Sequence, residues 1–101
     1  MIIQQNLVTL TTAGTVYSIA IPANATNLKF QCRELTEIIL YSWDNFTHYW
    51  TVPIPAAGAA ANNTGVVQYT NMRISPQGAT LYFKDVSNSG KHVEVEWAID
   101  G

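Results

Sequence analysis

Residues 91–100 read KHVEVEWAID, and this stretch decides the fold class because apolar and polar side chains alternate along it. The apolar positions are Val93, Val95, Trp97 and Ile99. The positions facing the other way are His92, Glu94, Glu96 and Ala98. Successive strand residues point to opposite faces of a sheet, so the pattern predicts a strand with one face in a core and the other in water.

The same alternation recurs towards the N-terminus. In residues 26–34, TNLKFQCRE, the side chains of Leu28, Phe30 and Cys32 share one face. Further strands are expected within residues 2–10, 15–21, 37–43, 48–54, 65–74 and 79–86. Clusters of Gly, Pro, Asn, Asp and Ser separate these segments, as is typical of turns.

Seven or eight short strands divided by turns predict an antiparallel sandwich or barrel. The 101 residues fit a single domain, residues 1–101, and no helical stripe, repeat or linker is visible. Segment 37–43, EIILYSW, is apolar on both faces, which indicates an inner strand. Pro53 restricts segment 48–54 to a sheet edge or a strand end, because proline cannot donate to the ladder.

Charge is scarce and unevenly spread. Charged residues make up 12% of the chain and hydrophobic residues 48%, and segments 1–28 and 45–72 contain no Asp, Glu, Lys or Arg. The net charge of −2 lacks the basic footprint of a nucleic-acid-binding protein. Because the cores of protein interfaces are depleted in charge, much of this surface is expected to face other protein.

The two charge-free segments supply the candidate contact surfaces. Residues 1–14 are expected to form an arm or an edge strand that pairs with a neighbouring sheet, since nothing in them blocks such pairing. Residues 49–65, YWTVPIPAAGAAANNTG, combine a strand with a chargeless, alanine-rich loop. The candidate interface residues are Ile2, Ile3, Leu7, Tyr49, Trp50, Ile54, Pro55, Ala57, Ala59 and Ala60.

No catalytic constellation is apparent, and an enzyme is not expected. His92 and Glu94 share a strand face and could ligate a metal, but most sites need a third ligand, so a solvated face is the better interpretation. Glu94 and Glu96 form a carboxylate pair that Lys91 and neighbouring strands can balance. Cofactor motifs are absent, and Cys32, the single cysteine, is interpreted as a small buried residue.

Aromatic side chains favour a second class of function. Tyr and Trp residues on a β-sandwich can form a platform for sugar rings, so a carbohydrate-binding module is the alternative. Trp97 is assigned to the core because it is in register with three aliphatic residues. Tyr49 and Trp50 lie on opposite faces of their strand, so one of the two is expected in the core and the other exposed.

The N-terminal sequence lacks the basic and apolar regions of a signal peptide, and no run of residues is long enough to span a membrane. Asn24, Asn45 and Asn62 each begin an N-x-T sequon. Without a secretion signal, these sequons are interpreted as accidents of composition, and no export by the secretory route is expected.

The order of four segments resembles the small all-β virion structural proteins of tailed bacteriophages. The segments are IPANA at 21–25, YWTVPIPAAG at 49–58, TLYF at 80–83 and VEVEW at 93–97, and the likeness spans roughly residues 16–99. These motifs are structural rather than catalytic. The chain departs from the pattern at PIPAAGAAANN, which is longer and richer in alanine than the expected loop.

The resemblance implies a jelly-roll-like sandwich, often a homotrimer. It further implies a capsid cement or decoration protein, with a tail or neck component as the alternative. Such a protein would be made in the host bacterial cytoplasm and would reside on the capsid surface. Its partners would be its own copies and the major capsid protein or another virion protein, with no cofactor, nucleic acid or membrane.

Overall fold

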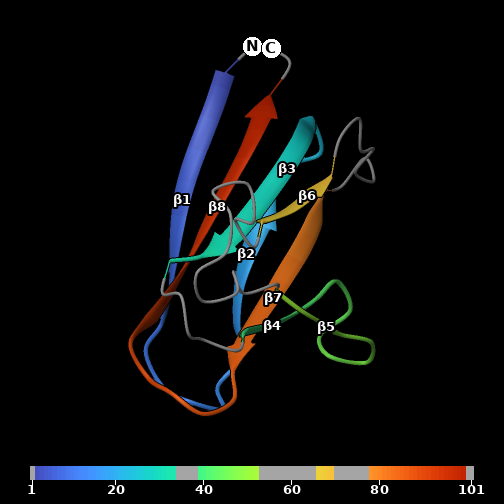
Figure 1. The fold of residues 1–101 in the computed structure, drawn as a ribbon. Coiled ribbons are helices and arrows are strands. Elements are labelled where there is room, and N and C mark those ends of the chain that lie inside the picture. Colours follow the sequence, from blue (N-terminus) through green and yellow to red (C-terminus); the bar gives the residue numbers. More distant parts are fainter. Residues whose placement is uncertain (1, 34–38, 53–65, 70–77, 100–101) are drawn as a thin grey trace.

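The computed structural model describes residues 2–33, 39–52, 66–69 and 78–99, and its regular structure is entirely β (Figure 1). It contains eight strands: β1 (Ile2–Leu10), β2 (Tyr17–Ile21), β3 (Ala25–Cys32), β4 (Ile39–Ser42), β5 (Trp50–Thr51), β6 (Val66–Tyr69), β7 (Ala79–Asp85) and β8 (Lys91–Ile99). They form two four-stranded sheets, ordered β1-β8-β3-β6 and β2-β7-β4-β5, and every pairing is antiparallel. The predicted antiparallel sandwich is therefore confirmed.

The pairing of the strands is that of a jelly roll. β1 pairs with β8, β2 with β7, β3 with β6 and β4 with β5, so the chain forms one long hairpin of nested strand pairs. When this hairpin is rolled up, β8 also pairs with β3 and β7 also pairs with β4. These two pairings complete the two four-stranded sheets, as in other eight-stranded jelly rolls.

The core lies between the two sheets and follows the alternation of the sequence. On β8, Val93, Val95 and Trp97 are buried as predicted. The ring centroid of Phe30 on β3 lies 4.9 Å from that of Tyr41 on β4 and 5.3 Å from that of Phe83 on β7, and both contacts are edge-to-face. Such aromatic contacts stabilise beyond area burial alone, so Phe30 joins the two sheets at the centre of the molecule.

Two features of the second sheet agree with the sequence. β4 lies between β7 and β5, and its Ile39, Tyr41 and Ser42 are buried, as expected of an inner strand. β5 comes last in the strand order of its sheet and ends at Thr51, so the strand before Pro53 lies at an edge as predicted.

β3 departs from a regular strand at one point. Its register against β8 shifts between Thr26 and Lys29, and Asn27 between them has a φ of 51°. Asn tolerates this left-handed conformation better than most residues, which permits the bulge. At the other end of β3, Cys32 is half-buried and packs against the core.

The loops that follow β1 and β7 are joined at one end of the sandwich. Gly14 N donates to Asp85 O at 2.7 Å, and Gly90 N donates to Leu10 O at 2.8 Å. The joined loops hold the C-terminal half of β1 in place, where Val8 and Leu10 are buried.

The described residues include no helix that could cross a membrane.

Candidate interaction surfaces

β1 forms an open edge of its sheet. It is the first strand in the order β1-β8-β3-β6, and among the described strands only β8 pairs with it. The register runs without a bulge from the pair Ile2–Ile99 to the pair Leu10–Lys91. Natural sheets protect such edges with charge, proline, bulges or shortness. β1 has nine residues and none of these devices, so its edge can accept another strand.

Three of the predicted interface residues lie on this edge strand, which Figure 1 shows at one side of the sandwich. Ile3 and Leu7 share the outer face of the sheet, and Ile2 lies on the opposite face, where sheet alternation places it. Each is between 46 and 57% exposed. Large aliphatic side chains thus accompany an unpaired backbone edge.

The inner face of β1 carries two amides beside the core. Trp97 Nε1 donates to Gln4 Oε1 at 3.1 Å, which satisfies the indole of this buried residue. Asn6 Nδ2 is buried and has no hydrogen-bond partner among the described residues. A buried donor without an acceptor costs free energy, about 1–3 kcal/mol, so Asn6 is an unusual feature of this edge.

A second surface surrounds β5. Tyr49 and Trp50 are 57 and 52% exposed, so the expectation that one of them lies in the core was wrong. The Trp50 ring stacks on Tyr41 at 5.7 Å, and the Tyr49 ring lies 6.0 Å from that of Phe46. β5 has only two residues at the edge of its sheet, and among the described residues both it and the preceding Tyr49 are exposed, so both aromatic rings remain accessible.

The turn before β5 is held by a network of hydrogen bonds. Ser42 Oγ is buried and accepts from the backbone N–H groups of Asp44 and Phe46 at 3.1 and 2.9 Å. The Asp44 carboxylate accepts from His48 N at 2.8 Å and lies 2.7 Å from His48 Nδ1. These contacts with His48, assisted by Ser42, lower the pKa of Asp44 to about 2. The network fixes the position from which Tyr49 and Trp50 project.

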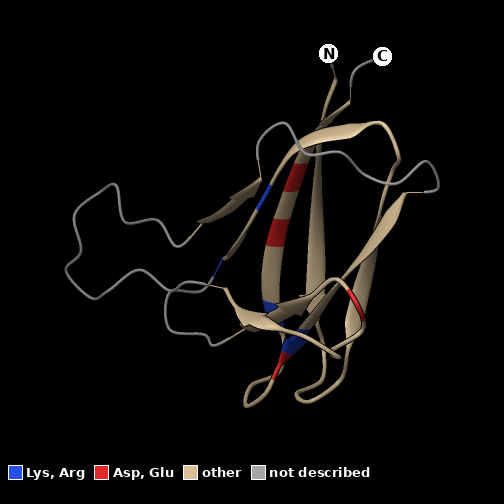
Figure 2. Cartoon of the chain, turned by 90° about the vertical axis from the view of Figure 1, so that its right-hand side faces the viewer, with Lys and Arg blue, Asp and Glu red and all other residues tan. Residues whose placement is uncertain are grey.

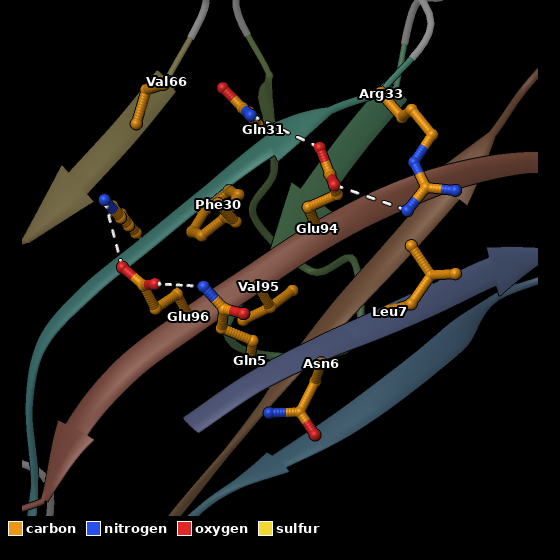
Figure 3. Close-up of a pocket in the computed structure, with 11 residues that line it drawn as sticks. Gln5, Asn6, Leu7, Phe30, Gln31, Arg33, Val66, Glu94, Val95 and Glu96 are labelled. Carbon is orange, nitrogen blue, oxygen red and sulfur yellow. Dashed lines mark hydrogen bonds and ion pairs between the residues drawn. The ribbon is translucent and has the colours of Figure 1, made fainter. Parts of the chain in front are cut away.

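The outer face of the first sheet has a hollow of about 430 Å³, shown in Figure 3. Glu96 of β8 lies within it, between two neighbouring strands. Its carboxylate accepts from Gln5 Nε2 of β1 at 2.9 Å and lies 3.0 Å from Lys29 Nζ of β3. The bond from Gln5, followed by that from Lys29, lowers the pKa of Glu96.

Glu94 occupies the other half of the hollow (Figure 3). Arg33 NH2 lies 3.4 Å from its Oε2, and Gln31 Nε2 donates to its Oε1 at 3.3 Å. Both carboxylates are therefore paired with side chains of neighbouring strands, as predicted, and the bases Lys29 and Arg33 come from β3 and its end. In the described part of the chain, no group of three His, Cys, Asp or Glu side chains is placed to hold a metal ion.

The strands on which the two candidate surfaces are built, β1 and β5, contain no charged residue, although Asp44 and Lys84 lie beside the aromatic rings around β5. Figure 2 shows Lys, Arg, Asp and Glu confined to short stretches of the chain, with most of the described ribbon uncharged. β1, β2, β5 and β6 contain no charged residue. In the outer hollow, Lys29 of β3 and Arg33 after it pair with Glu96 and Glu94 of β8.

Comparison of the chain with protein-family models, with curated proteins and with solved structures finds no match. The case for a function therefore depends on these surfaces.

The structure divides the predicted interface residues into two groups. Ile2, Ile3 and Leu7 lie together on β1, whereas Tyr49 and Trp50 lie at β5, at the opposite edge of the sandwich (Figure 1). The remaining predicted residues lie outside the described part of the chain: Ile54, Pro55, Ala57, Ala59 and Ala60.

Tyr41 was among the aromatic residues that the sequence offered for a platform, and its ring contacts that of Trp50. Sequence reasoning missed Phe46, whose ring lies by that of Tyr49, although its place in the WDNF turn was a signal. The amides Gln4 and Asn6 were also missed. The sequence feature that could have indicated them is the arrangement of residues 2–8, where three amide residues have two aliphatic residues on each side.

Proposed function

We propose that this chain is a non-enzymatic structural protein of a bacteriophage virion, a capsid cement or decoration protein that bridges neighbouring subunits of the shell. The observation that carries the proposal is the placement of two partly apolar surfaces, each built on a strand without charged residues, at opposite edges of one small sandwich. A protein with contact surfaces on two opposite sides can hold two neighbours together. The jelly roll is also an architecture of viral capsid domains, although a fold alone does not assign a function.

The mechanism is mechanical. Pressure from packaged DNA pulls capsid subunits apart, and a bound bridge opposes this by contributing buried surface that separation would expose. Interfaces that bind specifically bury about 1,200–2,000 Å² in total. Many copies that act together add avidity beyond any single contact. Exposed aromatic residues such as Trp50 are the type that dominates binding energy at interfaces.

Particles of a phage whose genome encodes this chain provide the test. We expect the chain to remain with particles purified on a density gradient, and antibody labelling to place it on the capsid. Particles that lack it should release DNA at a lower temperature than wild-type particles. Labelling of the tail or neck would support the alternative location, and absence of the chain from the particles would refute the virion role.

Carbohydrate binding is the second candidate, because Trp50 presents an exposed ring backed by Tyr41, next to the polar side chains of Asp44 and His48. Sugar rings stack on such platforms. A glycan panel monitored by tryptophan fluorescence would test this, with Trp50→Ala as the control that should lose the signal. If no glycan changes the fluorescence, this candidate is rejected.

A further inference from the structure

We propose that the open edge of β1 pairs with β1 of a second copy of this chain, antiparallel, with the two Gln5 residues facing each other across a two-fold axis. This pairing goes beyond the proposed virion role and does not depend on it. The inference comes from the order of residues along β1 and from the direction of its backbone groups.

Two hydrogen bonds show which backbone groups of β1 face the open edge. Leu10 O accepts from Gly90 N and therefore points towards the β8 side. On β8, His92 O accepts from Arg33 N at 3.0 Å and therefore points towards β3. The backbone groups of successive residues in a strand point to opposite sides. Each of the two bonds therefore shows that the backbone groups of the odd-numbered residues of β1 point to the open edge.

The outward backbone groups thus belong to Ile3, Gln5, Leu7 and Thr9. When Gln5 lies opposite Gln5 of a second copy, Ile3 of each copy lies opposite Leu7 of the other. These three residue pairs can exchange about six backbone hydrogen bonds. The exposed aliphatic side chains of Ile3 and Leu7 then cover each other on the outer face.

The inner face is complementary in the same register. Asn6 lies opposite Gln4 of the second copy, and Ile2 lies opposite Val8. Residues in such non-hydrogen-bonded pairs approach most closely, with Cα atoms about 4.5 Å apart. Amide residues thus lie opposite amide residues on this face, and aliphatic residues lie opposite aliphatic residues.

The two registers next to this one do not match like with like. Moving the axis by one residue towards the N-terminus places Ile3 opposite Gln5, and moving it the other way places Gln5 opposite Leu7. Both shifts set an aliphatic side chain against an amide. Since β1 contains no charge, no repulsion opposes the matched register. The arrangement of residues 2–8 is thus self-complementary about Gln5.

A disulfide can trap this contact and report its register. Cα atoms in a hydrogen-bonded antiparallel pair lie about 5.5 Å apart, within the range that a disulfide spans. Under mild oxidation, Gln5→Cys should form a two-chain band on non-reducing gels. Leu7→Cys is the matched control, because two copies of residue 7 would be about 13 Å apart and should not be linked. Wild-type protein, which keeps Cys32, gives the background.

Equal linking of the two variants, or linking of neither, would overturn the proposal. Light scattering supplies an independent measurement. One strand from each copy makes a small interface, so we expect weak association that reaches the mass of two chains only at high protein concentration. The resemblance to phage proteins favours a trimer instead, and a three-chain mass would contradict the two-fold pairing.

Complementary charges test the predicted neighbours. Leu7→Lys alone should lower the mass to one chain, because the ammonium would be buried against Ile3 of the second copy. Mixing this variant with Ile3→Glu should restore a two-chain species that weakens in salt, since the introduced carboxylate and ammonium would then face each other across the two strands. Failure of the mixture to associate would refute this register.

Discussion

At the scale of single residues, Gly78 is a position at which the chain needs glycine for two reasons. Its φ is +84°, and a Cβ there would lie 2.7 Å from Ile21 O. Gly14 has a similar φ of +78° but open space around it. We expect Gly14→Ala to cost about 1–2 kcal/mol, the usual penalty of the left-handed conformation, and Gly78→Ala to cost more. Urea unfolding followed by tryptophan fluorescence measures both, and equal losses would contradict the steric argument.

Asp44 should make stability depend on pH. Its contacts with His48 and Ser42 lower its pKa from the usual 3.8 to about 2, so the ionised carboxylate favours the folded state. This contribution is complete above pH 4 and is lost as the pH falls towards 2. Asp44→Asn should therefore unfold at lower urea than wild type at pH 7, and the two midpoints should converge near pH 2. A gap that persists at pH 2 would show that the charge is not responsible.

At the scale of elements, the strands with regular alternation were predictable because one of their faces is covered along the whole length. β8 and β7 are of this kind, and their inward residues are those expected. β1 has a mixed pattern because the other sheet covers its inner face only near Val8 and Leu10. The error at Tyr49 and Trp50 has a related cause. Alternation assumes a covered face, and the two-residue edge strand β5 has none.

Phe30 tests how the two sheets are held together. Its ring contacts those of Tyr41 and Phe83 from the opposite sheet, and it is almost completely buried. Phe30→Ala should lower the free energy of unfolding by about 3–5 kcal/mol. Phe46→Ala is the matched control, because Phe46 is half-buried outside the core. A comparable loss in both variants would mean that Phe30 has no special part in joining the sheets.

At the scale of the whole molecule, the two candidate surfaces have different roles if both proposals hold. Pairing through β1 would leave the β5 surface of each copy at the far side of its own sandwich, since β1 and β5 lie at opposite edges. A two-chain unit would then present two equivalent aromatic surfaces facing away from each other. Such a unit can contact two capsid subunits at once through its two aromatic surfaces, while the β1 surfaces hold the two copies together.

This arrangement predicts that substitutions in the two surfaces have different effects on attachment and on the two-chain mass. Trp50→Ala should abolish attachment to phage particles but leave the two-chain mass unchanged, because it removes the contact with the capsid and not the strand pairing. Leu7→Lys should lower the mass to one chain and weaken attachment by about 10²-fold or more, through lost avidity, without abolishing it. Co-sedimentation with particles and light scattering measure the two effects separately. If Leu7→Lys attaches as tightly as wild type, the two-chain unit is not the bridge. If Trp50→Ala attaches normally, the aromatic surface is not the contact with the capsid, whatever the outcome for β1.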